Sequence, residues 1–407
     1  MRISTASIFD SNSKQLNKLQ ASIARTQDQL SSNTRILAPS DDPVASARAL
    51  EVTQSQEMNE QYQTNRTNAR SSLSQVEVAL GNTTTLIQQI QTLAVSAGNG
   101  GMTQADRNAI ASELEGRLAD LLGVANTTDG AGGFLFSGYK ATTQPFNQTS
   151  TGASYGGDQG QRMLQVGPSR QLAISDSGSS IFENNATGNG SFQTQAAGAN
   201  KGSGVIAPGA VVDPTLVKNH NYSVSFAVGG TPSVTTYTVV DNSTTPAPTT
   251  VVPATAYKSG QSITFDGISF DIKGDPANGD SFSVKPSQKQ SVFQTVTELI
   301  ATIRTGTAGP GGSAAMTNGL NTAHSNLSAA LENVLTVRSS VGARLKELDY
   351  LDSNGDDLKV QYAETLEGLT GLDPAKAISD FTQQQFTLEA AQKSFKAMSG
   401  LSLFNYI

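Results

Sequence analysis

The chain has 407 residues, enough for two or three domains, and its formal net charge of -7 disfavours a nucleic-acid partner. It has no cysteine, which excludes disulfides, thiolate metal sites and cysteine nucleophiles. Only 15% of its residues are charged, so we expect a polar surface that can be buried against copies of itself without stranding many charges.

The first residues, MRISTASIFD, hold no apolar stretch long enough for a secretory signal peptide. No segment of the sequence reaches the length of an apolar membrane-spanning helix. If the protein leaves the cell, we therefore expect it to do so without a cleaved signal peptide, and we expect no membrane insertion.

A first amphipathic helix is predicted near the N-terminus, because apolar residues recur there at three–four spacing. Thr26 occupies the slot that this stripe leaves open, between the apolar residues Leu16, Leu19, Ile23 and Leu30. The helix should end before Pro39, which biases the preceding residue towards an extended conformation.

Two adjacent carboxylates, Asp41 and Asp42, precede Pro43. An aspartate accepts hydrogen bonds from the free N–H groups at a helix start, and proline is tolerated in the first helical turn. Both carboxylates also suit the positive end of the helix dipole. A metal site would need further ligands, and the local sequence offers none. We therefore predict a helix cap and break at Asp41, Asp42 and Pro43.

Apolar residues spaced seven apart then form two interleaved rows, which is typical of a coiled coil. In the N-terminal arm they are Tyr62, Ala69, Val76, Thr83, Ile90 and Ala97, with Leu73, Leu80, Ile87 and Ala94. In the C-terminal arm they are Leu320, Leu327, Val334, Val341 and Leu348, with Ala323, Ala330, Val337 and Leu351. Arg344 interrupts the second set, and we expect its charged end to extend to solvent. A last helix should carry Phe381, Leu388 and Phe395 seven apart.

Between the two arms the composition changes to glycine, serine, threonine and short β-branched runs. Alternation at period two predicts a hairpin from residues 222–228 and 234–240. Residues 262–272 predict a second hairpin around Asp266-Gly267, which is the strongest short hairpin signal in the chain. A further strand is predicted at 279–284, and we expect the first half of this insert to be loosely packed.

The predicted fold is therefore multidomain α + β, a long antiparallel coiled-coil-like helical rod built from both chain ends with an all-β domain inserted in the middle. We expect a terminal helical core domain at 1–42 and 365–407, a helical rod domain at 43–140 and 287–364, and a β-rich outer domain at 141–286. Both termini should lie together at the end of the rod away from the insert.

We expect no enzyme, cofactor or metal. The acidic run at 349–357 fails as a calcium loop, because Tyr350 and Gln361 fall at ligand positions that require carboxylates. His220 and His324 are far apart in sequence and lack the partners of a zinc site. The glycine-rich runs match no phosphate-binding loop, and we find no nucleophile–base pair.

Several segments in a fixed order resemble the flagellin superfamily, namely MRIST, SDDPVASARALE, FLFSGYK, DIKGDPANGDSFSV and AAQKSFKAMSGLSLFNYI. They are most similar to its hook-associated protein 3 branch, the hook–filament junction proteins. The ending LSLFNYI and the start of the chain both depart from flagellin itself. The resemblance covers both helical arms and the later part of the insert, whereas about 145–215 carries little of it.

This resemblance implies an extracellular structural component of the bacterial flagellum, exported unfolded through the flagellar type III pathway. It implies a position at the hook–filament junction, between hook-associated protein 1 and flagellin, as a ring of several copies, with a flagellar export chaperone as a further partner. It also implies that the terminal helices form the inner core of the tube and that the middle domain faces outward.

The terminal stripes suggest how such a protein assembles. Each large apolar side chain is worth about 1.5–3 kcal/mol when buried, whereas ordering each residue costs roughly 1–2 kcal/mol of backbone entropy. An isolated terminal hairpin is therefore marginal, and we hypothesise that it folds as it assembles. The alternatives are flagellin itself and a secreted coiled-coil adhesin with a β-rich head. The candidate assembly residues are Leu16, Leu19, Ile23, Leu30, Ile378, Phe381, Leu388, Phe395, Met398 and Leu401.

Overall fold

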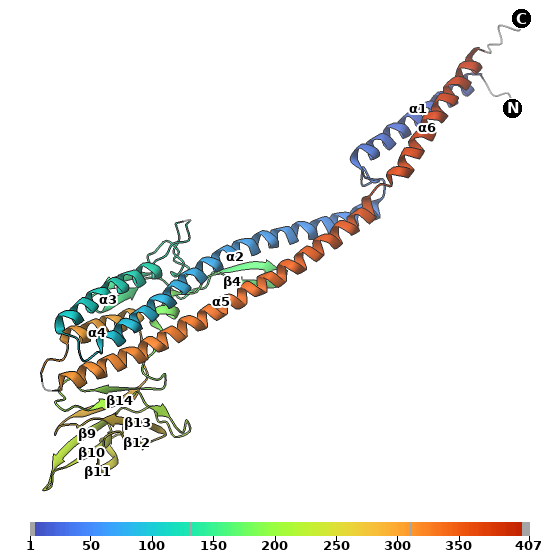
Figure 1. The fold of residues 1–407 in the computed structure, drawn as a ribbon. Helices are drawn as coiled ribbons and strands as arrows, with labels where there is room; N and C mark the ends of the chain where they lie inside the picture. Colours follow the sequence, from blue (N-terminus) through green and yellow to red (C-terminus); the bar gives the residue numbers. More distant parts are fainter. Residues whose placement is uncertain (1–4, 131, 310, 401–407) are drawn as a thin grey trace, which may run out of the picture. The chain divides into compact units, whose positions relative to one another are not determined.

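The computed structural model describes residues 5–130, 132–309 and 311–400 (Figure 1). The chain forms two compact units, a terminal unit from residues 1–65 and 350–407 and a central unit from residues 66–349. The predicted pairing of helices from both chain ends, with a β region inserted between them, is confirmed. The helices are α1 (Thr5–Ser32), α2 (Pro43–Ala97), α3 (Gln104–Ala125), α4 (Val292–Thr305), α5 (Gly312–Thr370) and α6 (Pro374–Gly400).

In the terminal unit α1 packs against α6 in the antiparallel sense (Figure 1). Phe9 in the first turns of α1 contacts Phe395 near the end of α6, with ring centroids 5.0 Å apart. At the other end of the pair, Thr34 and Gly371 form an isolated antiparallel bridge. The first part of α2 joins the last part of α5 in the same unit, where Asn59 Nδ2 donates to Gly355 O at 2.7 Å.

In the central unit most of the predicted seam is buried between α2 and α5, although Leu320 and Val337 are only half-buried. Polar side chains flank it, since Arg338 donates to Glu77 at 2.6 Å and Gln91 donates to Ser328 at 3.1 Å. Because an apolar stripe at heptad spacing stays on one side of a helix, the two stripes cover each other along the pair. The buried seam residues are Ala69, Leu73, Val76, Leu80, Ile87, Ile90, Leu327, Val334, Val341 and Leu348.

A second layer of helices, α3 and α4, lies beside this pair (Figure 1). Thr103 and Asp106 form a capping box at the start of α3, and Ser291 caps α4. The expectation that the first half of the insert is loosely packed is wrong, because its Phe146 and Phe182 pack beside Phe136 and the α4 residue Phe293. They form one cluster of fully buried rings with centroids 5.0–5.7 Å apart, Phe136, Phe146, Phe182 and Phe293.

The elements around this cluster are short. Three small antiparallel pairs, β1 with β2, β3 with β4 and β5 with β15, accompany a single turn of π-helix at Ser179–Glu183. The strands are β1 (Phe146–Thr149), β2 (Gly152–Tyr155), β3 (Met163–Gly167), β4 (Arg170–Ala173), β5 (Asn185–Ala186) and β15 (Lys289–Gln290).

The rest of the insert is a β domain with its own core. A five-stranded sheet has the order β11-β10-β9-β14-β6, and a second sheet has the order β12-β13-β7, with β8 also paired to β13. Aromatic and β-branched side chains pack into one cluster, which includes Phe226, Phe270 and Phe282. The strands are β6 (Phe192–Ala196), β7 (Val205–Ile206), β8 (Ala210–Val211), β9 (Tyr222–Gly229), β10 (Val234–Asp241), β11 (Thr249–Ala256), β12 (Ser262–Phe265), β13 (Ile268–Lys273) and β14 (Ser281–Pro286).

Both predicted hairpins are confirmed, as β9 pairs with β10 and β12 pairs with β13. In the second hairpin Asp266 and Gly267 have φ angles of 41° and 76°, the left-handed conformation that a two-residue primed turn requires. The predicted strand near 279–284 is β14, which lies between β9 and β6.

One expectation about a charged residue of α5 needs correction. Arg344 does not extend to solvent, since its guanidinium donates to Asp176 Oδ1 at 2.9 Å and to Ala173 O at 3.2 Å. The acidic run at 349–357 lies inside α5. Among the residues that the structure describes, no helix is both long enough and apolar enough to cross a membrane.

Candidate assembly site: the terminal helix pair

The candidate assembly residues of α1, which packs against α6, have half-buried side chains. This holds for Leu16, Leu19, Ile23 and Leu30. On α6, Phe381, Leu388 and Phe395 are half-buried in the same way, whereas Ile378 is 56% exposed. Met398 belongs to α6, but its side chain is not among those that the structure describes. Leu401 lies outside the described residues.

Burial in the terminal unit is incomplete. Within its described part, the buried side chains belong only to Thr26, Ala45, Asn59 and Ala377, so that no large apolar side chain is buried. Large apolar side chains are instead exposed on both helices, with Phe9 at 55% and Phe386 at 73%. A two-helix pair of this kind gains little from apolar burial, and it leaves apolar surface for another partner to cover.

The centre of the seam is polar. Thr26 Oγ1 lies 3.1 Å from Gln384 Oε1 and also 3.1 Å from Ser22 O. Charges on the pair are few and exposed, such as the Lys393–Glu389 ion pair at 2.7 Å. Exposed pairs of this spacing contribute only a few tenths of a kcal/mol, so charge does not hold the two helices together.

The two carboxylates at the break after α1 have different roles. Asp42 Oδ1 accepts from Ala45 N at 3.0 Å, and α2 begins at Pro43. Asp41 Oδ2 instead accepts from the backbone N–H groups of Leu37 and Ala38 at 3.0 and 3.1 Å. The hydrogen bond from Ala38 and then that from Leu37 lower the pKa of Asp41 below its ordinary value, and the nearby Arg25 guanidinium, 2.7 Å away, lowers it further.

The break is also tied to the C-terminal arm. Arg35 N donates to Thr370 O at 2.8 Å, and the Arg35 guanidinium donates to Leu369 O at 2.8 Å. On that arm Asp373 Oδ1 accepts from the N–H groups of Ala375 and Lys376, at 3.0 and 3.1 Å, where α6 begins. Our sequence interpretation missed Asp373, although Asp373-Pro374 repeats the pattern of Asp42-Pro43 that it used to predict a helix start.

Our sequence interpretation also missed three asparagines of α5 that hold the insert. Asn318, Asn326 and Asn333 all bond to groups of the insert. Asparagine is a poor residue for the interior of a helix, because its amide competes for backbone hydrogen bonds. The sequence did not set them apart, because α5 carries many other polar residues, Asn321 among them.

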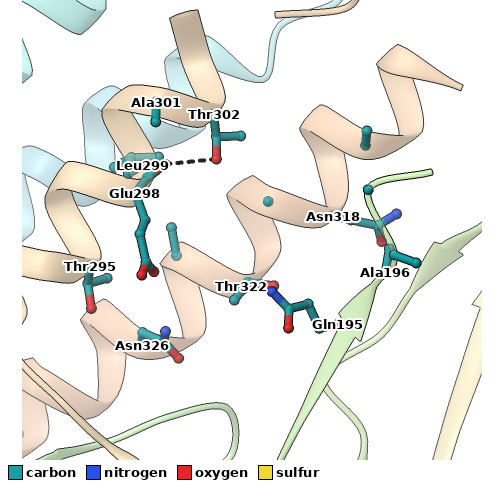
Figure 2. Close-up of a pocket in the computed structure, with 15 residues that line it drawn as sticks. Gln195, Ala196, Thr295, Glu298, Leu299, Ala301, Thr302, Asn318, Thr322 and Asn326 are labelled. Carbon is teal, nitrogen blue, oxygen red and sulfur yellow. Dashed lines mark hydrogen bonds between the residues drawn. The ribbon is translucent and has the colours of Figure 1, made fainter. Parts of the chain in front are cut away.

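The remaining polar groups do not form a catalytic or metal site within the described residues. His220 Nδ1 lies 2.6 Å from Asp241 Oδ2 in the β domain, and no group of three or more potential metal-binding side chains occurs in that part of the chain. A cavity of about 330 Å³ lies between α4, α5 and the end of β6 (Figure 2). Its lining has one carboxylate, Glu298, which accepts from Gln290 and Gln294 at 2.8 Å each.

The model of the bacterial flagellin N-terminal helical region matches residues 3–141, and the model of the D2-like domain of flagellar hook-associated protein 1 matches residues 196–286. The flagellar hook-associated protein 3 of Escherichia coli (strain K12) is 28% identical over 404 residues, which is 99% of each chain.

Two crystal structures from Legionella pneumophila are 30% identical to the chain. A flagellar hook associated protein-3 matches with a TM-score of 0.74 over 78% of this chain and 98% of its own. The flagellar junction protein FlgL matches with a TM-score of 0.72 over 80% and 100%. The chain therefore belongs to the flagellar hook-associated protein 3 family, a family of structural, non-enzymatic flagellar proteins within the flagellin superfamily.

Proposed function

We propose that this protein is a structural adaptor of the hook–filament junction, where it joins hook-associated protein 1 to the flagellin filament. Its family membership supports this role, since similar proteins include one described as a flagellar junction protein. The observation that carries the proposal is the incomplete burial of the terminal helix pair. Its apolar seam residues lie on either side of a polar centre, and no large apolar side chain in its described part is buried.

The mechanism is coupled folding and assembly. The chain leaves the cell unfolded, escorted as far as export by a chaperone, and its two ends pair once they are inside the growing tube. Copies of the chain then cover the exposed apolar faces of α1 and α6, and the subunits close into a ring. Burying such faces between copies supplies about 25 cal/mol per Å² of apolar area, which an isolated helix pair does not gain.

The proposal assigns one role to each part of the chain. Residues 1–42 and 365–407 form the assembly domain, 43–140 and 287–364 the supporting helices, and 141–286 the outer domain. In the assembly domain the contact residues are the seam residues of α1 and α6 together with Ile378, Met398 and Leu401. Asp41, Asp42 and Pro43 end the first helix and begin the next.

The proposal is tested by placing one charge in each half of the seam. We expect Ile23→Asp and Leu388→Asp each to abolish swimming when expressed in a strain that lacks its own copy of the gene, because a carboxylate cannot be buried there without a partner. The same cells should release flagellin into the medium. Gln89→Asp, at an exposed position of α2 in the central unit, is the matched control and should swim normally.

Two results would contradict the proposal. Normal swimming of both seam variants would show that the terminal pair is not the assembly contact. Long homopolymers grown from the purified wild-type protein alone would identify a filament subunit instead, because a junction protein should stop at a ring.

A further inference from the structure

The insert is attached to α5 through asparagine side chains of that helix. Asn318 and Asn326 are buried and Asn333 is half-buried. Each of them bonds to a backbone group of the insert. A buried amide without hydrogen-bond partners would cost free energy. These asparagines are therefore favourable only while the insert is packed on α5.

Asn318 forms hydrogen bonds to backbone groups at β7, as a neighbouring strand would. Its Nδ2 donates to Gly204 O at 3.0 Å, and its Oδ1 accepts from Ile206 N at 2.9 Å. One edge of β7 already pairs with β13, where Ile206 faces Ile272. A side-chain amide offers the same donor and acceptor as a peptide group, so Asn318 satisfies backbone groups of β7 that a neighbouring strand would otherwise satisfy.

The other two asparagines hold the chain that leads into the β domain. Asn326 Oδ1 accepts from Gly188 N at 2.8 Å. Asn333 Nδ2 lies 2.9 Å from Ser180 O, 3.1 Å from Ile181 O and 3.0 Å from Asn185 Oδ1. The three amides therefore contact the insert at successive points along α5.

A cavity lies beside the contacts of Asn318 and Asn326. The cavity in Figure 2 separates the end of β6 from α4 and α5, and Asn318 and Asn326 both line it. Most of the other lining side chains are small, such as Ala196, Ala315 and Ala323. Close packing across this cavity cannot fix the orientation of the β domain on α5. The directional hydrogen bonds of the asparagines therefore set it.

We propose that Asn318, Asn326 and Asn333 are positioning residues that form a clamp and set the orientation of the β domain on α5. The reason to fix this orientation rests on the proposed function. Identical subunits in a ring must hold their inserts at the same angle. The clamp itself concerns a single chain, so it can be tested without assembly.

The test measures a distance across the clamp in the full-length monomer. Because the chain has no cysteine, Thr250→Cys in β11 and Thr336→Cys in α5, both exposed, accept a pair of spin labels cleanly. We expect one narrow distance distribution in the otherwise wild-type chain. Alanine at Asn318, Asn326 and Asn333 together should broaden it into several distances. Asn321→Ala is the matched control, since Asn321 lies on the same helix, is half-buried and makes no side-chain hydrogen bond among the described residues.

Amide exchange separates loss of orientation from loss of folding. Asn318→Ala alone should speed exchange at Ile206 N–H by about tenfold, the effect of losing one hydrogen bond, while Val224 in the β-domain core keeps its protection. An unchanged narrow distance in the triple variant would overturn the clamp. Loss of protection at Val224 in the single variant would also overturn it, because Asn318 would then be required for folding. Neither result bears on the swimming test of the proposed function.

Discussion

The terminal and central units are both built on paired helices with apolar residues seven apart, yet they differ in what they bury. In the central unit most seam residues and the four-ring aromatic cluster are almost fully buried. In the described part of the terminal unit, the seam residues of α1 and α6 are only half-buried. The difference comes from additional layers, because α3, α4 and the insert cover the central pair, whereas α1 and α6 cover only each other. A heptad pattern therefore predicts which helices pair, but not whether the pair is complete.

Removing one phenylalanine from each unit should give the largest contrast. Phe293→Ala is expected to lower the free energy of unfolding of the central unit by about 4 kcal/mol, because it opens a cavity among Phe146 and Phe182. Phe395→Ala, which removes the ring beside Phe9, should leave the urea midpoint of the monomer unchanged while it abolishes assembly. Urea unfolding followed by circular dichroism measures the first effect, and swimming measures the second.

The comparison fails if Phe395→Ala destabilises the isolated monomer as strongly as Phe293→Ala does. The terminal pair would then have a complete core of its own. In the same way, slow amide exchange throughout α1 and α6 in a dilute monomer would show that the ends need no partner to fold.

Ion pairs should give the next largest contrast. Arg344 and Asp176 are mostly buried, with side chains 14% and 7% exposed. Arg344→Met should therefore cost the central unit about 3 kcal/mol, because it leaves the Asp176 carboxylate buried without its cation. The Lys393–Glu389 pair is exposed on α6, so Lys393→Met should cause no measurable change in either monomer stability or swimming. Equal effects of the two substitutions on urea unfolding would remove this distinction between the units.

Much of the fold could be predicted from the sequence because its signals are local. The heptad seam, the Asp-Gly turn at 266–267 and the proline at 43 each act within a few residues, and each lies where the pattern placed it. The packing of the first half of the insert could not be predicted. Phe146, Phe182 and Phe293 come from distant parts of the sequence, and their contact depends on how the chain returns to α4.

The candidate site was predictable to a different degree. The stripe on α1 and α6 follows from spacing alone, and the caps follow from Asp-Pro pairs. The asparagines of α5 did not stand out, because a polar residue on a helix is ordinarily solvated. Only the position of β7 and Gly188 reveals what Asn318 and Asn326 bond to.

The smallest expected effect is that the two units lose stability at opposite ends of the pH range. In the central unit, burial raises the pKa of Tyr155 to about 12, and its hydroxyl donates to Phe136 O and Asp158 O at 2.8 and 2.7 Å. A raised pKa in the folded state contributes stability below the ordinary tyrosine value near 10, and this contribution is lost as the pH rises from about 10 to 12. The urea midpoint of the central unit should therefore fall over this range, and Tyr155→Phe should make that fall shallower.

In the terminal unit the sign is reversed. The pKa of Asp41 is lowered by the hydrogen bonds from Ala38 and Leu37, so its contribution is present above the ordinary aspartate value and is lost as acid protonates it. The amide resonances of Leu37 and Ala38 should shift together in an acid titration, and Asp41→Asn should abolish that shift. An alkaline loss of order at the break, or an acid shift that persists in Asp41→Asn, would show that other groups govern this region. The contrast with the central unit would then be one of burial alone, without a difference in charge.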